Sequence, residues 1–319
     1  MNNSENINLL LIALNLIAGL VIFIFGVSNM SEGLKGVGTE RMKVLLGKTT
    51  NNIFVAILVG IIITTLLQSS SATIIMLIAM VNAQLLTSRQ SLGVILGSNI
   101  GTTIISQIIA YNIGEYAAVP LIIGLIIFLT FKTEKAKHIG KSILGMGLIF
   151  FGLQYIGQSA EPLKNLQSFT TMMTQIQNPY WGAFVGAITT LIIQASSATI
   201  GITLSLANQG LITLPGAIAV MLGAEIGTCF DTLMASVGRS REALRAGVFH
   251  LFFNMVSVFA GIILINPLVK LILFISGEAP LARQIANGHV IFNIFGVLLF
   301  VGFVPLISKV LLKIIPDKK

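Results

Sequence analysis

Residues Gln68–Thr73 read QSSSAT, and Gln194–Thr199 read QASSAT, so one polar motif occurs twice at a spacing of 126 residues. Other short segments keep the same spacing without a gap. They are Phe25-Gly26 with Phe151-Gly152, Val59-Gly60 with Val185-Gly186, and GSNIGTT at 97–103 with GAEIGTC at 223–229. Hydroxyl clusters can arise by chance in apolar helices, but ungapped register across four landmarks indicates an internal duplication.

The composition is that of a membrane protein. Hydrophobic residues make up 55% of the 319 residues and charged residues only 9%, with a mean hydropathy of +0.94, whereas soluble domains carry roughly 25% charged residues. Apolar segments of about 20 residues, the length that crosses hydrocarbon, recur from Ile7 to Ile315. We therefore expect one all-α polytopic domain, 1–319, embedded in the lipid bilayer of the cell membrane.

The net charge of +8 comes from basic residues in short loops between apolar segments. That placement suits topology determinants facing anionic lipid, and we expect no nucleic-acid partner. Cys229 is the single cysteine, so neither a disulfide framework nor a cysteine metal cluster is predicted. The first residues contain no Lys or Arg, so no cleavable signal peptide is expected.

Both motifs lie inside apolar stretches that are too long for one crossing. As a single helix, Ile53–Ala83 would measure roughly 45 Å, against a hydrocarbon core of about 30 Å. Folded at Gln68–Ser71, it forms a re-entrant hairpin whose arms each reach mid-membrane, and Tyr180–Asn208 does the same. The glycine motifs in Ser91–Asn112 and Pro215–Ser236 predict broken transmembrane helices.

The basic residues test whether these stretches are hairpins. With two hairpins, all 19 basic residues except Lys164, Lys270 and Arg283 share one side, whereas two full crossings give a weaker bias. The positive-inside rule therefore favours hairpins, with the N-terminus outside and the C-terminus cytoplasmic. The two halves then have opposite orientations, which predicts inverted-topology repeats at about 7–131 and 142–265 and an additional span at about 284–307.

The hairpin tips contain the hydrogen-bond donors and oxygen ligands that a small-ion site needs. Free N–H groups and the positive dipole end at the start of each second arm suit an oxyanion. Carbonyls at the end of each first arm, with Ser and Thr oxygens, suit a hard cation such as Na⁺. Helix packing by small hydroxyl residues is the alternative, but the duplication, the length of the stretches and the charge distribution together favour a site.

The glycine motifs add neutral oxygens and one carboxylate. Glu225 lies in the middle of its span, where a carboxylate must pair, become protonated or bind a cation. Close helix packing is the alternative reason for the glycines. Asp231 lies nearer the basic loop, where Arg239 or Arg241 can pair with it. The predicted Na⁺ ligands are Thr73, Asn99, Thr102, Thr103, Thr199, Glu225 and Thr228.

A second repeated pattern, H-x-x-F-N, does not keep the spacing of 126. It places His250 with Asn254 and His289 with Asn293 on shared helix faces, 39 residues apart. Interhelical hydrogen bonding is favoured over a ligand role. The two histidines begin spans that start on opposite faces, so we expect no metal site other than Na⁺.

These motifs resemble those of the type II sodium/phosphate cotransporter family in its short bacterial form. The resemblance rests on QSSSAT, VNAQLLTSRQSLGVILGSNIGTT at 81–103, QASSAT and GAEIGTC, and it covers roughly Gly19 to Met255. It implies a symporter that uses Na⁺ as coupling ion, without a cofactor, to take up inorganic phosphate by alternating access. Carried over by position, the implied phosphate ligands are Gln68, Ser69, Ser70, Ser71, Gln194, Ser196 and Ser197.

The sequence departs from the family pattern at three places. Ala195 replaces the first serine of the second tip, Glu225 stands where the first repeat has Asn99, and we expect no soluble regulatory domain of the kind that some bacterial relatives append. Alternative functions are transport of another small oxyanion or a carboxylate, or a non-transporting membrane scaffold or phosphate sensor. An enzyme is not expected, because no nucleophile–base pair is visible. The oligomeric state stays open, a homodimer included.

Overall fold

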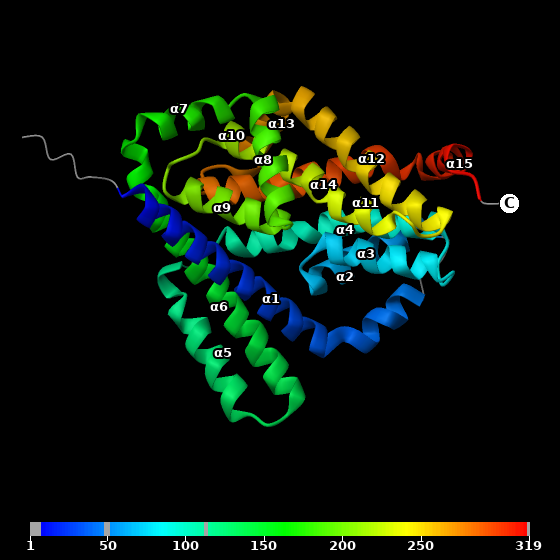
Figure 1. Cartoon of the computed structure of the whole chain (residues 1–319), viewed down its shortest axis with the longest axis horizontal. Coiled ribbons are helices and arrows are strands. Elements are labelled where there is room, and N and C mark those ends of the chain that lie inside the picture. Colours follow the sequence, from blue (N-terminus) through cyan, green and yellow to red (C-terminus); the bar gives the residue numbers. More distant parts are fainter. Residues whose placement is uncertain (1–7, 48–51, 112–113, 318–319) are drawn as a thin grey trace, which may run out of the picture.

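The computed structural model describes residues 8–47, 52–111 and 114–317, and these contain helices and no strands. Figure 1 shows α5 and α6 projecting from the body of the molecule, with α1 running alongside α6. The helices are α1 (Leu9–Gly47), α2 (Ile53–Leu67), α3 (Ser70–Asn82), α4 (Ser88–Ile109), η1 (Gly114–Tyr116), α5 (Ala118–Thr130), α6 (Glu134–Ala160), η2 (Glu161–Asn165), α7 (Gln167–Ile176), α8 (Pro179–Ile193), α9 (Ser196–Asn208), α10 (Leu214–Gly227), α11 (Cys229–Ser236), α12 (Arg241–Ile263), α13 (Ile265–Ser276), α14 (Leu281–Val301) and α15 (Val304–Ile314).

Within the described residues, six helical segments are long and apolar enough to cross a membrane. They are Leu9–Val37, Ser88–Ile109, Glu134–Asn165, Leu214–Ser236, Arg241–Ile263 and Leu281–Val301. Many large apolar side chains on these segments are exposed, as expected where lipid rather than protein surrounds a helix. The prediction of an all-helical, multi-pass membrane protein is confirmed.

Close glycine contacts make α2 and α4 run side by side in the same direction. A Cβ on Gly97 would lie 1.9 Å from the carbonyl oxygen of Ile57, and one on Gly101 would lie 2.7 Å from Cβ of Thr64. Both contacts advance along the two helices together. Because α4 follows α3 after a short turn and starts beside the start of α2, α3 must run back along α2.

The same contacts recur 126 residues later between α8 and α10. A Cβ on Gly223 would lie 1.8 Å from the carbonyl oxygen of Ala183, and one on Gly227 would lie 2.6 Å from Cβ of Thr190. The helix starts are also equivalent. The side-chain oxygens of Asn52 and Asn178 cap α2 and α8 by accepting hydrogen bonds from N–H groups of the first turn.

The two halves meet where α1 packs against α6. A Cβ on Gly26 would lie 2.8 Å from the carbonyl oxygen of Gly145, and one on Gly152 would lie 2.8 Å from that of Gly19. These contacts run in opposite directions along the two helices, so α1 and α6 are antiparallel. Gly145 and Gly152 lie 126 residues after Gly19 and Gly26, so each half contributes the same two glycines.

The prediction of broken helices at the glycine motifs is wrong for the first half. α4 is continuous through 97–103, and in the second half the interruption is confined to Thr228, between α10 and α11. The physical reason is that these glycines allow close helix contact, which was the alternative interpretation. The approach of Gly97 to the backbone of α2 leaves no room for a side chain.

α1 continues without a break through Ser31, because Gly33 packs on α6 and extends the contact. Residues 159–179 contain η2 and α7. One boundary differs from the sequence-based expectation of a span at about 284–307. The last span ends at Val301, and α15 follows after a short turn.

Candidate functional site

Both polar motifs form sharp turns centred on a glutamine. Gln68 and Gln194 adopt left-handed backbone conformations, with φ of 54° and 57°. In the described part of the chain, Gln84 is the only other non-glycine residue with positive φ. A side chain in this conformation costs roughly 1–2 kcal/mol, and such strain concentrates at functional sites. Its recurrence at equivalent positions makes the two turns, here called the first and second tips (68–71 and 194–197), the candidate site.

The start of the second arm differs between the tips. In the first tip, the Ser69 hydroxyl accepts a hydrogen bond of 3.1 Å from Ala72 N and caps α3. In the second tip, the equivalent Ala195 provides no side-chain cap for α9. The first N–H groups of a helix have no intrahelical acceptor. Ala198 N donates to the Ala195 carbonyl at 3.1 Å instead, so the two tips leave the same N–H groups at the helix start for a ligand, beside buried Ser196 and Ser197 in the second tip.

A pair of threonines joins the arms of each hairpin behind its tip. Thr64 Oγ1 donates to Thr73 Oγ1 at 2.9 Å, and Thr190 Oγ1 donates to Thr199 Oγ1 at 2.8 Å. Thr73 and Thr199 were predicted as cation ligands. Each holds the two arms of its own hairpin together, and this contact fixes the approach of the arms.

The tips also differ in burial. Gln68 is 5% exposed and Gln194 is exposed. Gln68 Nε2 donates to the Thr65 carbonyl, while its buried Oε1 has no hydrogen-bond partner among the described residues. Ser31 Oγ donates to the Leu67 carbonyl at 2.7 Å. In the first tip, one carbonyl predicted to be free for a cation is therefore already hydrogen-bonded.

The other neutral cation candidates are buried on the helices that carry the glycine motifs. Their side chains donate to carbonyls of their own helix, one turn earlier, which leaves oxygen lone pairs as potential ligands. The donors are Asn99, Thr102, Thr103 and Thr228. The described residues contain no group of three or more His, Cys, Asp and Glu side chains that could hold a metal ion.

Glu225 is buried on α10 and is paired with α14. Its Oε1 lies 2.7 Å from His289 Nε2 and accepts a 3.3 Å hydrogen bond from Asn293 Nδ2. Against an ionised carboxylate, which only accepts hydrogen bonds, His289 Nε2 would be the donor. In a neutral imidazole, Nδ1 then accepts from the Ser106 hydroxyl, 2.8 Å away on α4. The second carboxylate oxygen has no hydrogen bond within the described chain.

The other histidine makes an equivalent contact. His250 Nδ1 lies 2.7 Å from Thr232 Oγ1, whose hydroxyl donates to the Cys229 carbonyl. Thr232 lies 126 residues after Ser106, the partner of His289. The H-x-x-F-N helices α12 and α14 therefore bind equivalent positions of the two halves. Interhelical hydrogen bonding, the favoured interpretation, describes both contacts.

Asp231 faces the first tip and not the basic loop. It lies in the first turn of α11, and its carboxylate interacts with the side chain of Ser71 on α3. It forms no ion pair with the described arginines, and Arg239 instead donates to the Ala235 carbonyl. Sequence reasoning gave Asp231 only a pairing role, because the packing of α3 against α11 is not encoded in local sequence.

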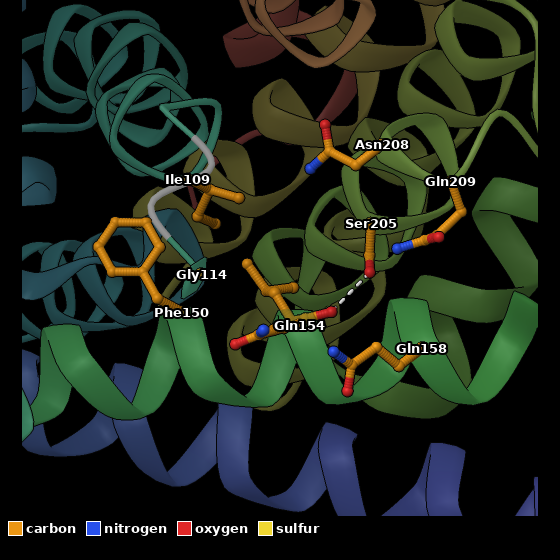
Figure 2. A pocket seen from close by; sticks show the side chains of 9 residues that line it. Ile109, Gly114, Phe150, Gln154, Gln158, Ser205, Asn208 and Gln209 are labelled. Atoms are coloured by element: carbon orange, nitrogen blue, oxygen red, sulfur yellow. Dashed lines mark hydrogen bonds between the residues drawn. The ribbon is translucent and has the colours of Figure 1, made fainter. Parts of the chain in front are cut away.

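A polar cavity of about 210 Å³ lies beside the far end of α9. Figure 2 shows that Gln154 and Gln158 come from α6, while Asn208 and Gln209 come from the end of α9. Ser205 stands between them and donates to the Leu153 carbonyl at 2.6 Å. The cavity lies roughly 15 Å along α9 from the second tip. No signal in the sequence marked these amides.

The long apolar helices, with buried polar side chains between them, define a multi-pass membrane protein. A family model described as Na+/Pi-cotransporter matches residues 22–158 and 163–303. The chain therefore belongs to the Na⁺/Pi-cotransporter family, as the motifs predicted.

Several relatives match across both halves. YqeW of Bacillus subtilis (strain 168) is 32% identical over 312 residues, which cover 97% of this chain and 100% of YqeW. YjbB of Escherichia coli (strain K12), whose name refers to inorganic phosphate export, is 25% identical over 312 residues, and this chain spans 57% of its length. The Homo sapiens sodium-dependent phosphate transport protein 2B is 31% identical over 133 residues, 38% of this chain and 19% of that protein. No solved structure matches the chain.

Proposed function

We propose that this protein is a secondary active transporter that couples Na⁺ to inorganic phosphate by alternating access around the two tips. The observation that carries the proposal is the recurrence of a strained glutamine followed by serines at a helix start. That arrangement presents N–H and hydroxyl donors to an oxyanion. The family and the phosphate named in two relatives support the same substrate.

The proposed architecture is a pair of inverted repeats, at about 7–131 and 142–265, with an additional span at about 284–307 in one domain, 1–319. The reciprocal glycine contacts of the antiparallel α1 and α6 support it. Two equivalent antiparallel helices are related by a two-fold axis perpendicular to both. If the helices cross the membrane, that axis lies in the membrane plane, as in many transporters.

The proposed hairpins are re-entrant. α2 and α8 have 15 residues each and α3 and α9 have 13, so at about 1.5 Å per residue none spans a core of about 30 Å. The ends of α3, α4, α12 and the chain are joined by hydrogen bonds from Ser240 N to Asn82, from Ser88 N to Glu242 and from Arg245 to Asp317. This shared end, rich in basic residues, is proposed to be cytoplasmic, with the N-terminus outside.

Phosphate is proposed to bind at the tips, through Gln68, Ser69, Ser70, Ser71, Gln194, Ser196 and Ser197. No Lys or Arg occurs in 53–83, 91–112, 180–208 or 215–236. The charge of phosphate must therefore be balanced by N–H groups, hydroxyls, helix dipoles and Na⁺. The free oxygen of Glu225 and the lone pairs of Thr73, Asn99, Thr102, Thr103, Thr199 and Thr228 are the proposed Na⁺ ligands.

The amide-lined cavity is proposed to form part of the access route to the second tip. A volume of about 210 Å³ accommodates several waters at roughly 30 Å³ each. Gln154, Gln158, Asn208 and Gln209 are neutral, so they can solvate phosphate and Na⁺ without trapping either. The direction of net transport depends on the gradients, so both uptake and the export named for YjbB agree with this mechanism.

The function is tested by uptake of labelled phosphate into liposomes containing the full chain. We expect an inward Na⁺ gradient to drive accumulation above equilibrium, and an equal K⁺ gradient to fail. Phosphate accumulation without Na⁺ would show that transport is not coupled to Na⁺. Sodium-driven movement of a carboxylate in place of phosphate would favour the alternative substrate. Absence of any flux, together with specific phosphate binding, would favour a sensor.

The topology is tested by labelling single cysteines in a Cys229→Ser background. Asn51 lies outside the described residues, so the exposed Asn52 next to it is labelled together with Ser88. We expect cysteines at both positions to react with an impermeant reagent from the cytoplasmic side. Reaction from opposite sides would show that Ile53–Ala83 crosses the membrane, and the inverted repeats would be rejected.

A further inference from the structure

Asp231 is a carboxylate at a tip proposed to bind an anion. Ser71, with which it interacts, belongs to the first turn of α3, and α3 packs against α11. A carboxylate beside bound phosphate is unfavourable if the facing phosphate oxygen has no proton, because like charges repel. Its presence there requires a ligand property that offsets this repulsion.

A second acceptor is located in the same tip. Gln68 Oε1 is buried and has no hydrogen-bond partner in the described chain, while Nε2 of the same amide is occupied by the Thr65 carbonyl. Asp231 has no ion pair with a described Lys or Arg. The first tip therefore contains one acceptor without a partner, Gln68 Oε1, and at Ser71 it contacts a second acceptor, the Asp231 carboxylate, near the N–H donors at the start of α3. This combination suits a ligand that both accepts and donates hydrogen bonds.

The acceptor pair is not a by-product of the duplication. The residue 126 positions before Asp231 is Ile105, which is 1% exposed and apolar. Gln194, the equivalent of Gln68, is exposed rather than buried. The second tip therefore has donors without a matching carboxylate, and the first tip alone tests whether the ligand carries a proton.

Resting on the proposed function, we propose that Asp231 is a specificity-determining residue that accepts a hydrogen bond from the P–O–H group of phosphate. At neutral pH, HPO₄²⁻ and H₂PO₄⁻ both keep at least one such group, whereas sulfate has none. A sulfate ion would instead place an unprotonated, negatively charged oxygen against the carboxylate. A site rejects a ligand of nearly the same shape by leaving buried polar groups unpaired or by placing like charges in contact.

The test measures sodium-driven phosphate uptake by full-length protein in liposomes, with three unlabelled competitors at neutral pH. Arsenate keeps a proton, whereas sulfate and monofluorophosphate are tetrahedral dianions without one. We expect arsenate alone to compete in the wild type. Asp231→Asn should lower the inhibition constants of sulfate and monofluorophosphate by about 10- to 100-fold, because the amide can donate and carries no charge. Arsenate inhibition should change little, because the amide oxygen still accepts.

Two further variants separate the causes. Asp231→Ile introduces the residue of the first repeat, which removes the charge without adding a donor, so it should admit the dianions less than Asp231→Asn does. Glu161→Gln alters an exposed acid paired with Lys164, and it should keep wild-type selectivity. If neither Asp231 variant folds, thermal shifts of the purified wild type still test the proposal, because stabilisation by sulfate or monofluorophosphate as strong as that by phosphate and arsenate overturns it.

The proposal is overturned if Asp231→Asn takes up phosphate with unchanged exclusion of both dianions. It is equally overturned if the variants alter only the half-saturating Na⁺ concentration, which would make Asp231 a cation ligand, or if the wild type is inhibited by sulfate as strongly as by arsenate. Absence of phosphate uptake by the wild type would instead reject the proposed transport function, so the two failures are distinguishable.

Discussion

Replacing Glu225 by glutamine tests whether the buried carboxylate takes part in cation coupling. The glutamine side chain has the same shape, and its Oε1 can still accept the hydrogen bonds that His289 and Asn293 now make to Glu225 Oε1. The connection between α10 and α14 should therefore persist. The substitution removes the negative charge, and it replaces the second carboxylate oxygen, a potential Na⁺ ligand, by an amide nitrogen.

The size of the effect follows from the surroundings of the carboxylate. Glu225 is 3% exposed, and two unit charges 4 Å apart attract by roughly 4 kcal/mol at an effective dielectric constant of about 20. Desolvation of both ions offsets part of this attraction. A net contribution of about 1.5–3 kcal/mol, typical of hydrogen bonds to charged groups, corresponds to a rise of roughly 10- to 100-fold in half-saturating Na⁺.

The assay is phosphate uptake at fixed phosphate and varied Na⁺, combined with the current carried per phosphate across a clamped liposome membrane. Glu225→Gln should weaken Na⁺ activation or change the net charge that moves with each phosphate. Glu161→Gln is the matched control, because its carboxylate lies on an exposed surface. Unchanged Na⁺ activation and unchanged current in Glu225→Gln would refute the reasoning and leave Glu225 as a structural partner of His289.

Two other predictions follow from the tips and from the helix contacts that position them. Ser70→Ala and Ser196→Ala should each raise the half-saturating phosphate concentration by about 10- to 100-fold, since each removes a hydroxyl donor to a charged ligand. The control Ser28→Ala, on the exposed side of α1, should have no effect. Unchanged phosphate affinity in both tip variants would contradict the shared site. Gly97→Ala should lower the free energy of unfolding in detergent by about 1–3 kcal/mol or more, because its Cβ would lie 1.9 Å from a carbonyl oxygen. The control Gly302→Ala would place its Cβ with no atom within 4 Å, so it should melt at the same temperature as the wild type.

The helix boundaries at the motifs were readable from the sequence. A continuous apolar stretch longer than the membrane, interrupted by QSSS, marks a turn, and α2 and α3 meet at Gln68 and Ser69. The duplication was readable for the same reason, since equal spacing of short motifs survives where the rest of the sequence diverges. The left-handed conformation of the glutamines was not readable, because it is imposed by the packing of both arms and not by residue preference.

The role of the glycine motifs was predicted less well. A glycine in a helix can permit unwinding or close packing, and the two have the same local sequence. Only the partner helix decides, and Gly97 and Gly223 face backbone carbonyls of helices 40 residues earlier in the chain. The histidine contacts were hidden in the same way. Ser106 and Thr232 gave no signal until the fold set α14 and α12 beside them.

Besides the interruption at Thr228, the halves differ in charge at the positions of Glu225 and Asp231. The two tips, the threonine pairs and the glycine contacts repeat at the same spacing, but Glu225 replaces an asparagine and Asp231 replaces an isoleucine. Both carboxylates belong to the second half, yet Glu225 contacts α14 and Asp231 contacts the first tip. A symmetric frame would hold phosphate and Na⁺ equally from either side. Two carboxylates on one half break that equivalence, and under the proposed site the second tip, which has no neighbouring Asp231, should be the stronger anion site. Substitutions at Ser196 should therefore weaken phosphate binding at least as much as those at Ser70.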